Sequence, residues 1–338
     1  MKLALFFNGQ KLIAGTDNGQ SSFFDSSLIF QDPDLFTARF LFQIRVRFGI
    51  DDLEQIENLV LAISGVMDNK NNRIKRSYFL NDIAITKIYD GFSFNDALLG
   101  NVDRDRIFLL NDALALTLGA SQRIEQSLLP AMVLSLDDGI GVGFINSPKS
   151  VDAREWGGDY VPSISKNMWE ALGRNSIYSL LFDKKININE TYTEYLIQSI
   201  KYLSHKYAKD NPPIKSVFIM GEKTQYLSER QLREKLNEYD LSIVTDENER
   251  RSIIISGCFA YPLYVASQNN RVTKIQYFSG QELIYDFDDF QKYREHFISM
   301  KPLSNPENYY KIFYASGSVT TIAMRDINDV SELDLYRF

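Results

Sequence analysis

An apolar run that breaks into alternating glycines constrains the fold of this chain most. The run begins at Met132, and apolar residues resume after Gly139, Gly141 and Gly143. This pattern predicts two strands joined by a tight hairpin. Glycines at every second position remove the side chains from one face, so the backbone N–H groups of residues 139–143 could approach a phosphate closely. A glycine hairpin without any ligand fits the same residues equally well.

A carboxylate at the end of a buried strand is the second informative feature. Residues 106–110 predict a strand that runs into Asn111 and Asp112, and residues 113–119 predict the start of a helix. In open α/β sheets, ligands bind at the edge where the strands end. An Asp at this position is also a good helix cap. Both interpretations of Asp112, as a ligand contact and as a cap, stay open on these residues alone.

A compact loop of charged and aromatic residues, 154–158, follows the hairpin and contains Glu155. With this order of strand, Asn-Asp, helix, glycine hairpin and Glu-bearing loop, the chain resembles the ROK family of sugar kinases and sugar-responsive repressors. That family belongs to the superfamily of actin, hexokinase and the heat-shock chaperone ATPases. Its members typically carry Asn-Asp-Ala at the catalytic position, a glycine-rich second phosphate loop and Glu-Ile-Gly-His after it. The resemblance extends over residues 2–268, as an order of motifs with several substitutions.

The resemblance implies an α/β fold with two ribonuclease H-like, actin-type subdomains around a central cleft. Residues 1–117 would form the N-terminal subdomain, completed by a helix at 249–268, and residues 118–248 the C-terminal one. Residues 271–338 lie outside the resemblance and predict a small α+β extension with at least three strands, to which we assign no function. A chain of 338 residues, 44% of them hydrophobic, can bury the cores of two or three domains.

The resemblance also implies roles for single residues. Asp112 would act as general base, taking the proton from the sugar hydroxyl that attacks the γ-phosphate of ATP. The sugar would be held by residues at three places in the chain. These are Ser64, Gly65, Asn111, Asp112 and Glu155. The nucleotide would meet two phosphate loops and a glycine that follows a later strand. These residues are Gly9, Lys11, Asp138, Gly139, Gly141, Gly143 and Gly221.

Several positions depart from the family pattern. Phe6 stands where relatives have an Asp that helps to hold Mg²⁺, and Gln10 replaces a Thr. A Phe cannot order the waters of Mg²⁺, which requires oxygen ligands. Asp137 and Asp138 replace Gly-Thr in the second loop, where two carboxylates would repel a polyphosphate unless a cation lies between them. Either one of them replaces the lost carboxylate at position 6, or nucleotide binding has decayed. Gly158 replaces the family His.

The composition argues against several partners and metals. A formal net charge of −7 argues against a nucleic-acid or anionic-membrane surface. Cys258, the single cysteine, leaves no cysteine cluster for zinc, so we expect none of the structural zinc sites found in many relatives. His205 and His296 lie in polar helical contexts, and we expect no metal ligands among the side chains. No apolar segment is long enough to span a bilayer, and we expect a cytoplasmic protein.

Two further segments have a simple periodic pattern. Residues 2–7 and 11–15 predict the two strands of a hairpin, which would carry the first phosphate loop. Residues 36–48 alternate between apolar and polar side chains, which is the period of a half-exposed strand. The arginines of this second segment would then lie on a solvated face.

Three functions are compatible with these observations. The first is ATP- and Mg²⁺-dependent phosphorylation of a hexose or amino-hexose. The second is a catalytically inactive pseudokinase that binds a sugar or serves as a protein-interaction scaffold, which the changes at Phe6, Gln10 and Gly158 favour. The third is a repressor of the DNA-binding branch, the least favoured, because the chain is acidic and no helix-turn-helix precedes the first predicted strand. A homodimer and a protein partner for residues 271–338 are compatible with the sequence.

Overall fold

The computed structural model divides the chain into two compact units, Met1–Tyr261 and Pro262–Phe338. It describes all 338 residues except 9–10, 26, 31, 52, 69–70, 78–88, 99–100, 138, 148–149, 155, 183–185, 270–271, 280, 288–307, 315–318 and 324–338. The expected subdomain bounds at residues 117 and 248 stay predictions.

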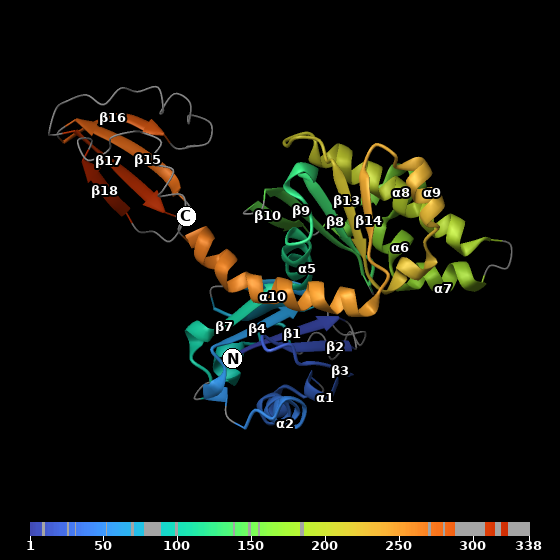
Figure 1. Ribbon diagram of the computed structural model, residues 1–338, viewed down its shortest axis with the longest axis horizontal. Helices are drawn as coiled ribbons and strands as arrows, with labels where there is room; N and C mark the ends of the chain where they lie inside the picture. Colours follow the sequence, from blue (N-terminus) through green and yellow to red (C-terminus); the bar gives the residue numbers. More distant parts are fainter. Residues whose placement is uncertain are drawn as a thin grey trace. The chain divides into compact units, whose positions relative to one another are not determined.

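The first unit contains two five-stranded sheets (Figure 1). The first sheet has the order β3-β2-β1-β4-β7. Its strands are β1 (Lys2–Asn8), β2 (Lys11–Thr16), β3 (Ser21–Asp25), β4 (Asn58–Ile63) and β7 (Ile107–Asn111). Strands β1, β2 and β3 pair antiparallel, whereas β4 is parallel to both β1 and β7. The hairpin expected at residues 2–7 and 11–15 is confirmed.

The second sheet repeats this topology, with the order β10-β9-β8-β13-β14. Its strands are β8 (Ala131–Ser135), β9 (Gly141–Ser147), β10 (Ser150–Arg154), β13 (Ser216–Met220) and β14 (Asp240–Ile243). Three consecutive strands again pair antiparallel, and two later strands add in parallel. The hairpin expected around the alternating glycines is formed by β8 and β9. Two ribonuclease H-like sheets in one unit confirm the predicted actin-type α/β fold.

Two helices lie between the sheets (Figure 1). Helix α5 (Asp112–Ser121) follows β7 directly, and α10 (Glu247–Asn269) follows β14. The two helices cross at Gly119 and Gly257, where a Cβ built on Gly257 would lie 2.7 Å from the backbone nitrogen of Gly119. A Cβ on Gly15 of β2 would lie 3.0 Å from Cγ1 of Ile255. Helix α10 therefore packs on both α5 and the first sheet.

The other helices of the unit cover the outer faces of the sheets (Figure 1). They are α1 (Ser27–Phe30) and α2 (Phe36–Phe48) on the first sheet, and α6 (Met168–Leu172), α7 (Arg174–Phe182), α8 (Ile188–Tyr207) and α9 (Glu229–Lys235) on the second. Short elements complete the unit. They are α4 (Phe94–Ala97), the hairpins β5 (Gly65–Asp68) with β6 (Arg73–Ser77) and β11 (Tyr160–Val161) with β12 (Lys166–Asn167), and 3-10 turns at Pro33–Leu35, Leu53–Gln55, Arg104–Arg106, Gln126–Leu128, Trp156–Gly158, Pro162–Ile164 and Glu222–Tyr226.

The strand expected at residues 36–48 is wrong, because this segment is helix α2. Its buried positions are Phe36, Phe40, Gln43 and Ile44, which have helical spacing. Phe42 and Val46 are exposed to 61% and 62%, and these exposed apolar side chains produced the apparent alternation. The helix ends at Gly49, which has φ 67° and whose N–H donates to the carbonyl of Arg45.

The described part of the second unit consists of the last turns of α10, from Pro262 on, and a four-stranded antiparallel sheet with the order β16-β15-β17-β18. Its strands are β15 (Val272–Ser279), β16 (Glu282–Phe287), β17 (Asn308–Tyr314) and β18 (Val319–Ala323). The expectation of at least three strands is confirmed. In the described portion of the whole chain, no helix combines the length and the apolar character that a membrane crossing requires.

Candidate functional site

Four of the five residues expected to hold a sugar lie at one edge of the first sheet, and these are Ser64, Gly65, Asn111 and Asp112. Ile63 of β4 lies in register with Phe7 of β1 on one side and with Asn111 of β7 on the other. These three strands are parallel, so the segments that follow them leave the sheet at the same edge. The structure therefore places Ser64 and Gly65 beside Asn111 and Asp112.

The Asn111 side chain connects these segments. Its Nδ2 donates to the carbonyl of Gly65 at 3.0 Å. Its Oδ1 accepts from the backbone N–H groups of Ala113 at 2.8 Å and Leu114 at 3.4 Å, so Asn111 is the N-cap of α5. Asp112 is the first residue of the helix, is half-buried, and accepts from Ala113 N–H at 2.9 Å. The cap role considered for Asp112 is thus carried mainly by Asn111.

The glycine hairpin lies against the first turns of α5. A Cβ on Gly141 would lie 3.1 Å from Cβ of Ala113, and a Cβ on Gly143 would lie 2.7 Å from Cγ2 of Thr117. These two glycines therefore let the strand β9 approach the helix closely. A Cβ on Gly139 would meet nothing within 4 Å. The close approach brings the turn of the hairpin next to the helix start that carries Asp112.

The loop that carries Glu155 packs on the same hairpin. Glu155 itself lies outside the described residues. Two residues later, a Cβ on Gly157 would lie 2.8 Å from the carbonyl oxygen of Ile140 in the hairpin turn. This contact sets the turn at Trp156–Gly158 beside the hairpin.

Two cations lie against the ring of Trp156 in that loop. The guanidinium carbon of Arg154 lies 4.7 Å from the Trp156 ring centre, and Nζ of Lys206 lies 4.2 Å from it. Each cation is also paired with a carboxylate, Arg154 with Asp152 at 2.6 Å and Lys206 with Asp159. These contacts fix the backbone on the C-terminal side of Glu155.

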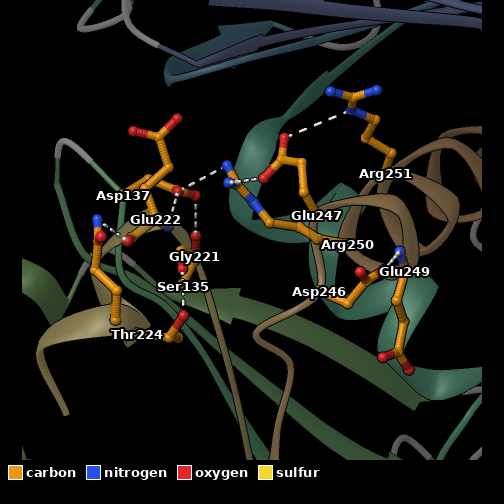
Figure 2. A network of polar contacts seen from close by, with 11 residues as sticks. Ser135, Asp137, Gly221, Glu222, Thr224, Asp246, Glu247, Glu249, Arg250 and Arg251 are labelled. Atoms are coloured by element: carbon orange, nitrogen blue, oxygen red, sulfur yellow. Dashed lines mark hydrogen bonds and ion pairs between the residues drawn. The ribbon is translucent and has the colours of Figure 1, made fainter.

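A buried ion pair holds Asp137, which lies in the turn of the hairpin between β8 and β9 (Figure 2). Oδ1 of Asp137 lies 2.8 Å from Nη2 of Arg250, in the first turns of α10, and accepts from the N–H of Glu222 at 3.0 Å. Its Oδ2 accepts from the hydroxyl of Ser135 at 2.7 Å. Asp137 is 8% exposed and Arg250 is 3% exposed. Arg250 also pairs with the carboxylate of Glu247 at 3.3 Å.

Gly221, expected to contact the nucleotide, packs against the backbone of Leu136, the residue that follows β8. It has φ 124°, and a Cβ here would lie 2.5 Å from the carbonyl carbon of Leu136. Leu136 N–H donates to the carbonyl of Met220 at 2.7 Å, and Lys223 N–H donates to the carbonyl of Leu136 at 3.0 Å. Backbone hydrogen bonds therefore join the second glycine loop to the Gly221 turn.

Only part of the first phosphate loop belongs to the described residues. Phe6 is 1% exposed and belongs to the interior of the first sheet. Lys11 begins β2 opposite Asn8 of β1, and Gly9, Gln10 and Asp138 lie outside the described residues. Because Phe6 is an apolar core residue and the Asp137 carboxylate is paired with Arg250, neither side chain is set up as an oxygen ligand for Mg²⁺.

No metal centre is visible where the structure describes the chain, since no group of three or more His, Cys, Asp or Glu side chains could hold an ion there. His205 is an exposed residue in the last turn of α8, and His296 lies outside the described residues. Cys258 is buried in α10.

The role of Arg250 was not predicted from the sequence, although one signal indicated that a buried cation was needed. The acidic residues at positions 137 and 138 follow a fully buried strand, so a carboxylate there needs a counter-charge. The sequence does not say which cation supplies it, because Arg250 lies 113 residues away. Ser135 was likewise read only as part of an apolar strand.

No protein-family model matches this sequence, and no curated relative does either. Solved structures match the fold. The ROK family glucokinase from Streptomyces griseus, solved with glucose and AMPPNP, is 11% identical with a TM-score of 0.54, and the match covers 76% of this chain and 98% of that one. The inorganic polyphosphate/ATP-glucomannokinase from Arthrobacter sp. strain KM is 13% identical with a TM-score of 0.53, covering 78% and 98%. A ROK family protein from Streptococcus pneumoniae TIGR4, solved with sucrose, is 12% identical with a TM-score of 0.51, covering 77% and 97%. The chain therefore has the fold of the ROK family sugar kinases.

Proposed function

We propose that this protein binds a hexose or amino-hexose and phosphorylates it with ATP, with Asp112 as the general base. Asn111, Glu155 and the Ser64–Gly65 segment would hold the sugar. Gly9, Lys11, Asp138, Gly139, Gly141, Gly143 and Gly221 would meet the nucleotide. ATP would supply the phosphoryl group, and we assign no metal ligand to a side chain of this protein.

The observation that carries this proposal is the arrangement around Asn111. Its side chain joins the Gly65 carbonyl to the first turn of α5 and so holds Asp112 at the edge where three parallel strands end. A general base must lie within hydrogen-bond reach of the hydroxyl that it deprotonates, so it needs a half-exposed and fixed position. Asp112 has such a position, since it is half-buried at a capped helix start.

A second candidate, sugar binding without phosphoryl transfer, is favoured by the phosphate side of the site. Phe6 is buried at the position where relatives have an Asp that helps to hold Mg²⁺. Beside the second glycine loop, the Asp137 carboxylate already accepts from the Arg250 guanidinium and the Glu222 N–H. In this case the protein would act as a sugar sensor or scaffold. A homodimer, a protein partner for residues 271–338 and a cytoplasmic location stay predictions from the sequence.

Thermal unfolding with a panel of hexoses and N-acyl hexosamines, with and without Mg²⁺-ATP, tests the proposal. A ligand present at 100 times its Kd stabilises the native state by about 2.7 kcal/mol. For the kinase, we expect a sugar to raise the unfolding temperature, and Mg²⁺-ATP to increase this shift further. The same sugar should also support the formation of ADP from ATP. A sugar shift that nucleotide leaves unchanged supports the second candidate, and no shift with any sugar contradicts both.

A further inference from the structure

The carboxylate of Asp137 is bound in the way that proteins bind a phosphate oxygen. It accepts from a guanidinium, a backbone amide and a hydroxyl, supplied by Arg250, Glu222 and Ser135. These are charge-assisted and oriented donors of the kind that hold anions. Their convergence on a carboxylate that is only 8% exposed marks a built anion site, already filled from within the chain.

The donors come from three separate segments (Figure 2). Ser135 ends β8, Glu222 follows the Gly221 turn, and Arg250 lies in the first turns of α10. The first two segments are those expected to meet the nucleotide, and the Asp137 carboxylate belongs to the hairpin turn that also contains Gly139. The anion site therefore lies beside the position at which the proposed function requires a phosphate.

The guanidinium of Arg250 retains an unused donor. Its Nε is buried and has no hydrogen-bond partner among the described residues, although the side chain is only 4% exposed. A buried N–H without an acceptor costs free energy. The Asp137 carboxylate presents two oxygens, and one of these is directed to Ser135. A phosphate group presents more oxygens and could satisfy this donor as well.

We propose that Asp137 is a built-in anion that fills a phosphate site formed by Arg250, the Glu222 amide and the Ser135 hydroxyl. A phosphate group binds there only when the Asp137 carboxylate has left, so Asp137 lowers the affinity of the protein for phosphate-bearing ligands. Arg250 is then a phosphate-binding residue outside the glycine motifs. The inference rests on the proposed function for its ligand class, a nucleotide phosphate or free inorganic phosphate.

Binding of inorganic phosphate, pyrophosphate and AMPPNP to the full chain, measured by calorimetry without sugar, tests this inference. The variant Asp137→Asn keeps the size of the side chain and an acceptor for the Glu222 amide but removes the charge. It is expected to bind at least one of these probes about tenfold more tightly than the wild type, because the donors hold a neutral amide less strongly than a carboxylate, so that a phosphate displaces it at a lower cost. A gain with AMPPNP alone identifies a nucleotide as the source of the phosphate, and a gain with all three shows that free phosphate suffices.

Two further variants make the result specific. The double variant Asp137→Asn/Arg250→Met is expected to lose the gain, because the guanidinium is the main donor of the site. Asp51→Asn removes a carboxylate from an exposed ion pair with Arg45 and is expected to bind as the wild type does. An unchanged affinity in Asp137→Asn, or a gain that persists in the double variant or occurs in Asp51→Asn, would overturn the proposal.

A second measurement covers the case in which Asp137→Asn does not fold in chloride buffer. Refolding is then compared in phosphate and chloride at equal ionic strength. Phosphate is expected to restore folding, since it supplies an anion in place of the Asp137 carboxylate that the variant lacks, and equal yields in the two salts contradict the proposal. Neither measurement uses a sugar. A negative result here therefore contradicts the phosphate site alone, whereas the absence of a thermal shift with sugars contradicts the proposed function.

Discussion

Asp137 and Arg250 are opposite charges removed almost completely from water. Taking each ion out of water costs several kcal/mol, which their attraction and their additional hydrogen bonds offset. The bonds to Ser135 and Glu222 on one side and to Glu247 on the other complete the network. The pair joins the start of α10 to the turn after β8. Removing either side chain would leave the other charge buried without its partner, which would destabilise the protein.

Arg250→Met is therefore expected to destabilise the protein strongly. The variant leaves a buried carboxylate without its cation, which costs about 3–5 kcal/mol. Urea unfolding monitored by far-UV circular dichroism would measure the change. Asp137→Asn/Arg250→Met is expected to lose less than Arg250→Met, because no buried charge remains uncompensated. A double variant that is as unstable as Arg250→Met would show that the two charges are not coupled.

The reactivity of the Cys258 thiol measures how well α10 is packed at this residue. Burial raises the pKa of its thiol to about 12, so almost no thiolate forms in the native protein at pH 8. The thiolate is the reactive form, and an unfolded cysteine has a pKa of about 8.5. We expect no reaction with Ellman's reagent in native buffer and one thiol per chain in guanidinium chloride. Rapid labelling of the native protein would contradict the buried position.

At the scale of elements, the crossing of α5 and α10 depends on small residues. Gly119 and Gly257 face each other, and their lack of side chains lets the two backbones come together. The same helices carry Asp112 at the start of α5 and Arg250 at the start of α10. Their separation therefore affects both the proposed sugar side and the proposed phosphate side of the site.

Gly257→Ala is expected to force α10 away from α5. The new Cβ would lie 2.7 Å from the backbone nitrogen of Gly119 and 2.9 Å from the carbonyl carbon of Ala115, and backbone cannot yield as a side chain does. Overpacking of this kind costs about 1–3 kcal/mol, measurable by urea unfolding. Gly158→Ala, where a Cβ meets nothing within 4 Å, is the matched control and should change the stability far less. Equal stability of Gly257→Ala and the wild type would contradict the close crossing.

Local patterns predicted the elements that have one buried face and clear ends. The hairpins β1–β2 and β8–β9 follow from apolar runs broken by turn residues. Helix α2 was misread because Phe42 and Val46 are apolar but exposed, so alternation outweighed the helical spacing of the buried residues. Contacts between distant segments could not be read from local patterns, and the pairing of Asp137 with Arg250 is the clearest case.

At the scale of the whole molecule, the first unit uses one sheet topology twice. Strand ends of the first sheet carry Asn111 and Asp112, and the hairpin of the second sheet packs against the helix that starts there. The motif order, through the resemblance, predicted this duplication and the meeting of these segments. It predicted nothing about the pairing order of the four strands of the second unit, which lies outside the resemblance.

Sugar binding by Asp112→Asn tests the central claim most directly. Calorimetry would compare the wild type, this variant and Asp105→Asn, which removes an exposed carboxylate away from the site, using the sugar that gives the largest thermal shift. A hydrogen bond to a charged group contributes about 1.5–3 kcal/mol, so Asp112→Asn is expected to weaken binding at least about tenfold and to abolish turnover, with Asp105→Asn unchanged. Equal sugar affinity of Asp112→Asn and the wild type would contradict the placement of the sugar at the edge that carries Asn111 and Asp112.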